Sequence, residues 1–139
     1  MDQWGYDWEA HKVTTEDHYI LTTFHILSKK GESTSAESKG TVLCQHGDYE
    51  DGASWLAPFD GKPFHLSLVD EGYDVWIGNN RGTEYSQEHE TLSPKDDNEY
   101  WLYTWADMGL YDDTANIKMI KEHTDVEKVF YVGYSQGTI

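Results

Sequence analysis

The stretch KVFYVGYSQG, residues 128–137, decides the fold. Its first half is rich in aromatic and β-branched side chains, which favour a short buried strand. A Gly-x-Ser-x-Gly pattern follows at Gly133, Ser135 and Gly137. Glycines on both sides permit a tight strand-to-helix turn that exposes the serine hydroxyl. A packing or phosphate-binding glycine turn is the alternative, and the strand directly before the pattern favours a nucleophilic serine.

A second motif, QHGD at residues 45–48, ends an earlier apolar run at residues 41–44. In an architecture with a serine turn, a backbone N–H at this place helps to bind the oxyanion of the tetrahedral intermediate. The predicted donors are the backbone N–H groups of Asp48 and Gln136. His46 is either a structural histidine that hydrogen-bonds the loop or a proton-transfer group, and the structural role is favoured.

The hydrophobic pattern predicts the rest of the architecture. Residues 13–15 and 19–27 flank a polar turn and predict an antiparallel hairpin. Apolar runs predict later strands, and helical spacing predicts two helices, one of which begins near Pro63 and one of which has an interrupted apolar face. Two strand-helix-strand units after a hairpin predict an α/β fold with a mixed sheet, parallel through its middle. These elements are the strands 41–44, 73–77 and 128–132, the helices 62–71 and 105–120, and the loops 28–40, 78–82, 93–99 and the one holding Trp55 and Phe59.

Composition excludes several classes of protein. A chain of 139 residues is one domain or a piece of one. Ten Lys and Arg oppose 26 Asp and Glu, and the net charge of −16 disfavours nucleic acid as a partner. Mean hydropathy is −0.75, but six Trp, ten Tyr and four Phe exclude a disordered chain. The single cysteine, Cys44, excludes an intrachain disulfide and is expected to be a core residue.

Several motifs in order make this chain resemble the acid lipases of the α/β-hydrolase superfamily, which include gastric and lysosomal lipases and sterol-ester hydrolases. The resemblance covers nearly the whole chain. It implies the N-terminal part of one α/β-hydrolase domain, with a hairpin and loop over residues 1–40 and the first part of the core over residues 41–139. The motifs are residues 5–6, 11–21, 43–47, 72–82, 85–86 and 131–138, with Trp105, Met108 and Tyr111–Asp112.

The resemblance implies hydrolysis of neutral lipid esters, either triacylglycerol or sterol ester. Ser135 would attack the ester carbonyl, an acyl-enzyme would form, and water would release the fatty acid. No metal or organic cofactor is implied, because nucleophile, base and oxyanion hole are all protein groups. Relatives of this type are mostly secreted or lysosomal. Residues 1–6 show neither the basic nor the apolar region of a secretory signal, and no apolar run is long enough for a membrane span.

Asp48 departs from the family pattern, which usually has an apolar residue after the His-Gly pair. A carboxylate about 6 Å from the oxyanion would raise the barrier by roughly 3 kcal/mol at an effective dielectric near 20, about a hundredfold in rate. If the side chain faces solvent, this cost nearly vanishes.

The catalytic triad of α/β-hydrolases runs in the order Ser, acid, His, yet all seven histidines precede Ser135. We therefore expect the acid and the histidine outside these residues, and the 139-residue chain alone to be inactive. The last strand would present an open parallel edge that a partner protein could cover. The alternative is a non-catalytic relic of a hydrolase that serves as a binding or structural subunit.

Three charged groups receive structural interpretations. Arg81, in an Asn-Asn-Arg-Gly turn, is expected to pin loops by fork-like hydrogen bonds rather than bind substrate. The acid pairs Asp96–Asp97 and Asp112–Asp113 are expected to be solvated faces rather than a metal site. For Asp112 there is an alternative, because its place in the family motif implies a structural hydrogen bond at a helix.

Overall fold

The computed structural model describes residues 1–32, 37–57 and 61–138. The predicted loop position of Phe59 lies outside these residues. Short 3-10 turns occur at Asp2–Trp4, Gly52–Leu56, Asn98–Trp101 and Ser135–Thr138. The predicted loop around Trp55 therefore contains one of them, and the predicted loop 93–99 overlaps another. The strands are β1 (Tyr6–Thr14), β2 (Tyr19–Lys29), β3 (Thr41–Gln45), β4 (Asp74–Ile77), β5 (Glu88–His89) and β6 (Phe130–Gly133), and the helices are α1 (Phe64–Asp70), α2 (Trp105–Asp107) and α3 (Thr114–Thr124).

The strands form one mixed sheet in the order β1-β2-β4-β3-β6, with β5 paired to β2. β1 and β2 form the predicted antiparallel hairpin, and β4, β3 and β6 run parallel. The predicted mixed sheet is therefore confirmed. β1 begins at Tyr6, earlier than predicted. The sequence pattern does not reveal its first residues, because most side chains of this edge strand are exposed and show no regular apolar alternation.

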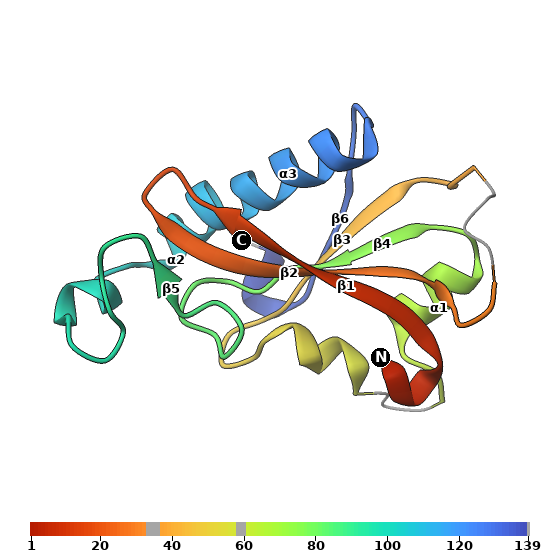
Figure 1. Cartoon of the computed structure of the whole chain (residues 1–139), viewed down its shortest axis with the longest axis horizontal. Coiled ribbons are helices and arrows are strands. Elements are labelled where there is room, and N and C mark those ends of the chain that lie inside the picture. Colours follow the sequence, from red (N-terminus) through yellow and green to blue (C-terminus); the bar gives the residue numbers. More distant parts are fainter. Residues whose placement is uncertain (33–36, 58–60, 139) are drawn as a thin grey trace.

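Helices cover the sheet on opposite sides, α1 on one face and α3 on the other (Figure 1). Alternation along the strands separates the two cores. Val75 and Ile77 of β4 pack with Leu66 of α1, whereas Trp76 packs with Ile120 of α3. The first core also holds Cys44, whose burial raises the pKa of its thiol to about 12. Cys44 is thus the core residue that the sequence predicts.

Helix α1 is shorter than predicted. It begins at Phe64 with Pro63 as N-cap residue, and Gly72 follows its end with a φ of 88°. Phe64 is 53% exposed, whereas Leu66 is fully buried. These two residues are two positions apart, so their side chains point about 200° apart around the helix and only one of them can face the sheet.

The predicted long helix contains a π-helical turn, Met108–Asp113, between α2 and α3. A π-turn inserts extra residues into the helical repeat, which explains the interrupted apolar face. Here the expected solvated face of Asp112–Asp113 is wrong, because Asp112 is fully buried. Tyr131 donates a hydrogen bond to Asp113 Oδ2 at 2.9 Å, and burial raises the pKa of Asp113 to about 6.

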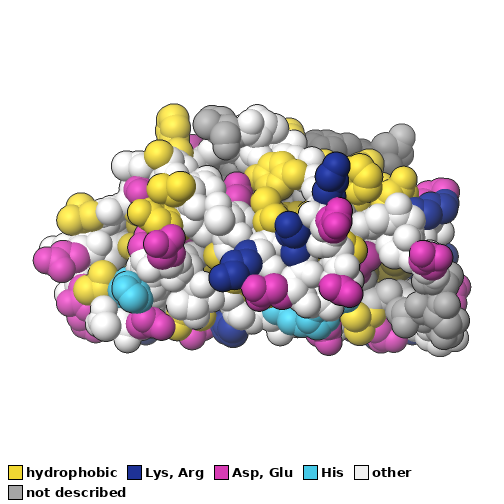
Figure 2. Space-filling view, turned by 90° about the horizontal axis from the view of Figure 1, so that it is seen from above, with side chains coloured by type: hydrophobic (Ala, Val, Ile, Leu, Met, Phe, Trp, Pro, Cys, Tyr) yellow, Lys and Arg dark blue, Asp and Glu magenta, His cyan; other side chains and the backbone are white. Residues whose placement is uncertain are grey.

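β6 forms one edge of the sheet among the described residues, and its first two side chains, Phe130 and Tyr131, are exposed. Figure 2 shows one face of the molecule, on which hydrophobic side chains lie between acidic and basic ones. None of the helices in the described ranges has the length and hydropathy needed to cross a membrane.

Candidate active site

Ser135 stands at a sharp turn directly after β6. Its φ of 52° is in the left-handed region, which costs a non-glycine residue energy. Tyr134 N donates to Gln45 O at 3.2 Å, and Gly137 N donates to Tyr134 O at 2.9 Å, so backbone bonds on both sides hold the turn. Ser135 itself is exposed. A strained backbone that presents an exposed hydroxyl is the geometry of a nucleophile elbow.

Two glycines make this turn possible. A Cβ atom on Gly133 would lie 2.0 Å from Gly137 O. A Cβ atom on Gly137 would lie 2.6 Å from Gln45 O. Both distances are shorter than any real contact with a backbone oxygen, so glycine is required at each position. The tight turn predicted from the Gly-x-Ser-x-Gly pattern is therefore present.

The loop after β3 lies directly against this turn. A Cβ atom on Gly47 would be 3.0 Å from Ser135 Cβ. The structure thus brings the QHGD motif to the serine, as the strand order predicts for neighbouring parallel strands β3 and β6. Asp48 and Gln136, the two residues with predicted oxyanion N–H donors, both line an open hollow of about 740 Å³. Trp101, Tyr103 and Met108 contribute apolar surface to the same hollow.

The Asp48 side chain is exposed, and its Oδ1 accepts a hydrogen bond from Tyr49 N at 3.0 Å. Water screens an exposed carboxylate strongly. This position favours the second of the two cases considered above, in which the carboxylate faces solvent and adds little to the barrier.

His46 is buried, and both of its ring nitrogens contact backbone groups. Nδ1 lies 2.8 Å from Gly47 O, and Nε2 lies 3.1 Å from Asn80 N. A neutral ring that donates from Nδ1 and accepts at Nε2 satisfies both contacts. Burial lowers the pKa of His46, which favours this neutral form. His46 therefore fixes the loop beside Ser135, in agreement with the structural role favoured from sequence.

Arg81 forms a side-chain network, here called the Arg81 anchor, with Asp17 and Asp112, in which Arg81 and Asp112 are buried and Asp17 is partly exposed. Its two terminal nitrogens contact the Asp17 oxygens at 2.6 and 2.8 Å, and its Nε contacts Asp112 Oδ1 at 2.8 Å. Arg81 N also donates to Asp112 Oδ2, and the guanidinium lies 3.9 Å from the Tyr19 ring centroid. The fork-like pinning predicted for Arg81 and the structural hydrogen bond considered for Asp112 are both confirmed. Sequence reasoning missed Asp17, because nothing in a polar turn marks a partner 64 residues away.

Comparison with family models decides the identity of this fold. Residues 40–139 match the model described as alpha/beta hydrolase fold, and residues 1–58 match the partial alpha/beta-hydrolase lipase region. The chain belongs to the α/β-hydrolase family. Both matches agree with the elbow after β6 and with the N-terminal hairpin.

Curated relatives of this α/β-hydrolase are lipases by name. It is 42% identical to mouse lipase member K over 138 residues, which are 99% of this chain and 34% of the relative. It is 38% identical to rat gastric triacylglycerol lipase and to human lysosomal acid lipase/cholesteryl ester hydrolase, covering 97% and 99% of this chain and 34% of each relative. The predicted resemblance to acid lipases is confirmed. The chain spans about a third of the length of these relatives.

A solved structure shares the fold. An esterase from Pyrococcus furiosus superposes with a TM-score of 0.62 over 98% of this chain and 45% of the esterase chain. Its sequence is only 19% identical, so the likeness concerns the α/β-hydrolase architecture alone.

Proposed function

We propose that Ser135 is the nucleophile of a carboxylic ester hydrolase that acts on neutral lipid esters, triacylglycerol or sterol ester. The observation that carries this proposal is the left-handed backbone of Ser135, held between two glycines that admit no side chain. The printed names of the relatives, which include a gastric triacylglycerol lipase and a lysosomal cholesteryl ester hydrolase, support the substrate class. Those names also support a secreted or lysosomal location.

In this proposal the backbone N–H groups of Asp48 and Gln136 bind the oxyanion. Asp48 directly follows Gly47, which lies against Ser135, and Gln136 directly follows the nucleophile. Donors fixed in the backbone stabilise charge that develops in the transition state without reorganising. Loss of one such donor typically lowers the rate by about a hundredfold to a thousandfold.

In this proposal the acid and the histidine of the triad come from outside these 139 residues. All seven histidines of the chain precede Ser135, and His46, in the loop beside the serine, has both nitrogens engaged by backbone. An unassisted serine hydroxyl is a weak nucleophile at neutral pH. The 139-residue chain alone is therefore inactive, and the exposed β6 edge is the place where further sheet or a partner protein pairs.

A fluorophosphonate probe tests the assignment, because it modifies only an activated serine. We expect the natural gene product to be labelled on the peptide that contains Ser135, and the Ser135→Ala variant to lose the label. The 139-residue chain alone should stay unlabelled. A natural product that is unlabelled although it is folded by circular dichroism would overturn the proposal and favour the non-catalytic relic. Labelling of the short chain would overturn the statement that the base lies elsewhere.

A further inference from the structure

We infer that Glu9, His11, His25 and His123 form a binding site for one divalent transition-metal ion, with Zn(II) as the preferred ion. Three elements supply the four side chains: β1, β2 and α3. The site is separate from the proposed nucleophile, because β4 and β3 lie between β2 and β6 in the sheet. It is called here the β1-β2-α3 cluster.

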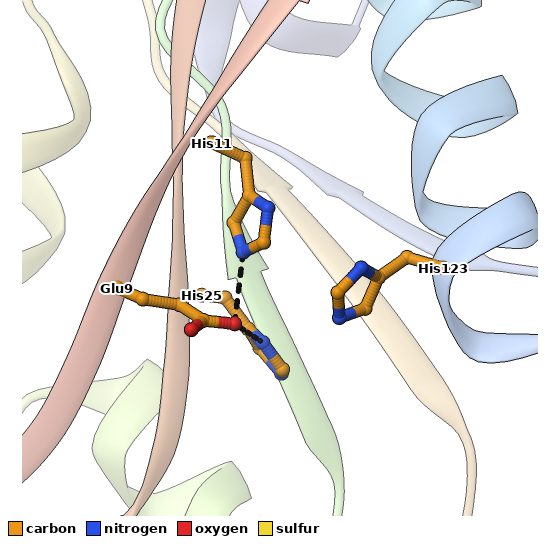
Figure 3. A group of neighbouring side chains, drawn as sticks. All are labelled: Glu9, His11, His25 and His123. Atoms are coloured by element: carbon orange, nitrogen blue, oxygen red, sulfur yellow. Dashed lines mark hydrogen bonds and ion pairs between the residues drawn. The ribbon is translucent and has the colours of Figure 1, made fainter.

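The fold brings these residues to one face of the sheet. Glu9 and His11 are two residues apart on β1, so their side chains project to the same side. His25 of β2 is paired in register with Glu9. Helix α3 covers this face, and His123 in its last turn points toward the two strands (Figure 3).

The distances within the cluster suit a metal ion. Glu9 Oε1 lies 2.9 Å from His11 Nε2 and 3.3 Å from His25 Nδ1. The rings of His11 and His123 are 4.9 Å apart, and one donor atom from each of the four residues lies within 4.8 Å of all the others. Zn–N bonds of about 2.0–2.1 Å place tetrahedral ligands roughly 3.3 Å apart. His123 is exposed, so its side chain has room to turn toward the other three ligands when an ion binds.

Asp74 holds His25 in the orientation of a metal ligand. Its Oδ1 lies 2.6 Å from His25 Nε2, so the other nitrogen, Nδ1, points at Glu9. The ring also stacks on Trp76 at 3.9 Å, and Trp76 Nε1 donates to Asp74 Oδ2. A carboxylate behind a ligating histidine fixes its tautomer and strengthens it as a donor. The four proposed ligands, together with the carboxylate of Asp74 behind His25, therefore form a preorganised ligand set.

The donor set selects the ion. Imidazole nitrogens suit Zn(II), Cu(II) and Ni(II), whereas Ca(II) and Mg(II) prefer oxygen ligands. Four protein ligands leave no open position, which is typical of a structural zinc site. The charges also balance, because the carboxylates of Glu9 and Asp74 together match the two positive charges of the ion. A bound ion replaces the protons that His11 and His25 share with Glu9.

Such an ion has a structural role, since it joins the last turn of α3 to the β1-β2 hairpin. The expectation that no metal takes part rests on the chemistry of ester hydrolysis, and this ion has no part in that chemistry. Sequence spacing does not reveal the site, because the two strands and the helix come together only in the folded chain.

Cobalt substitution and zinc competition test the inference on the natural protein after treatment with a chelator. We expect one equivalent of Co(II) to give the strong visible absorption of a tetrahedral site, and Zn(II) to displace it. The His123→Ala variant should lose this absorption, since its imidazole completes the ligand set and its exposed position leaves the fold intact. Asp74→Asn should keep the stoichiometry and weaken Zn(II) binding by about 10–100-fold.

His18→Asn is the matched control. His18 contacts Glu90 at 2.6 Å, and the His89 ring centroid lies 6.2 Å from that of His18, but among the described residues these side chains do not bring three donor atoms together as the β1-β2-α3 cluster does. Asparagine tolerates the φ of 76° at His18. We expect this variant to bind Co(II) and Zn(II) like the natural protein. Absence of a one-equivalent site in the natural protein, or equal binding by His123→Ala and His18→Asn, would overturn the inference.

Discussion

The turn at Ser135 and the Arg81 anchor are held in opposite ways. The serine turn is exposed and is fixed by backbone contacts among residues that follow one another after β6, with one neighbouring loop. In the Arg81 anchor, Arg81 and Asp112 are buried, and charged side chains from three distant segments hold it in place. The geometry of the serine turn thus depends on local backbone requirements, whereas the framework around it depends on long-range side-chain pairing.

The largest expected effect comes from breaking the anchor. Arg81→Met leaves the fully buried Asp112 without its charged partner, and loss of one member of a buried pair typically costs about 3–5 kcal/mol. Urea unfolding of the natural protein and the variant measures this loss in the free energy of unfolding. Lys95→Met, at an exposed lysine, is the control and should change stability by about 0.5 kcal/mol or less. A loss below about 1 kcal/mol for Arg81→Met would contradict the role of the anchor.

A smaller loss of stability, with a larger loss of reactivity, is expected at the serine turn. Gly133→Ala forces a methyl group against Gly137 O, and such overpacking costs about 1–3 kcal/mol. Fluorophosphonate labelling of Ser135 should disappear in this variant while the far-ultraviolet circular dichroism is kept. Gly61→Asn is the control, because Gly61 has open space around it and asparagine tolerates its φ of 74°. Full labelling of Gly133→Ala would show that the turn does not need glycine.

Acid should have the smallest and most local effect, at the loop beside the serine. Burial lowers the pKa of His46, so the stability that its neutral form contributes is present above the unfolded pKa of about 6.5 and is lost as pH falls through the folded value. A protonated Nε2 cannot accept the hydrogen bond from Asn80 N. Hydrogen exchange of the Asn80 amide, corrected for its intrinsic pH dependence, should therefore accelerate in acid.

The Gly52 amide serves as the internal reference, because it donates to Asn79 Oδ1, which does not titrate. In His46→Gln the acid-specific acceleration at Asn80 should vanish. Equal acceleration at both amides in the natural protein would mean that acid loosens the whole loop region and not the His46 contact.

Local patterns in the sequence predict much of this fold. The hairpin, the parallel strands and the glycine-flanked turn each depend on neighbouring residues, and the structure contains all of them. The sequence pattern does not predict the π-turn, in which Asp112 is buried against Arg81, because this contact joins residues 31 positions apart. That same burial is the reason why the expectation of a solvated acidic face was wrong.

The residues of the candidate site also fall into those that a local pattern predicts and those that only the folded structure reveals. Ser135 and its glycines are recognised from five consecutive residues, and the roles of Asp48 and Gln136 as oxyanion donors stay predictions. Asp17 and the β1-β2-α3 cluster were not foreseen, since their members meet only when strands and helices far apart in the chain pack together.

The sequence separations within the Arg81 anchor also determine when its contacts form during folding. Asp17 and Arg81 are 64 residues apart, and Arg81 and Asp112 are 31 apart. Closing loops of this length costs conformational entropy before the contacts can offset it, so long-range pairs form late. During synthesis from the N-terminus, the β1-β2 hairpin is complete long before Asp112 exists. The arginine therefore stays solvated through the early stages of folding and becomes buried only when the helical segment docks on the sheet.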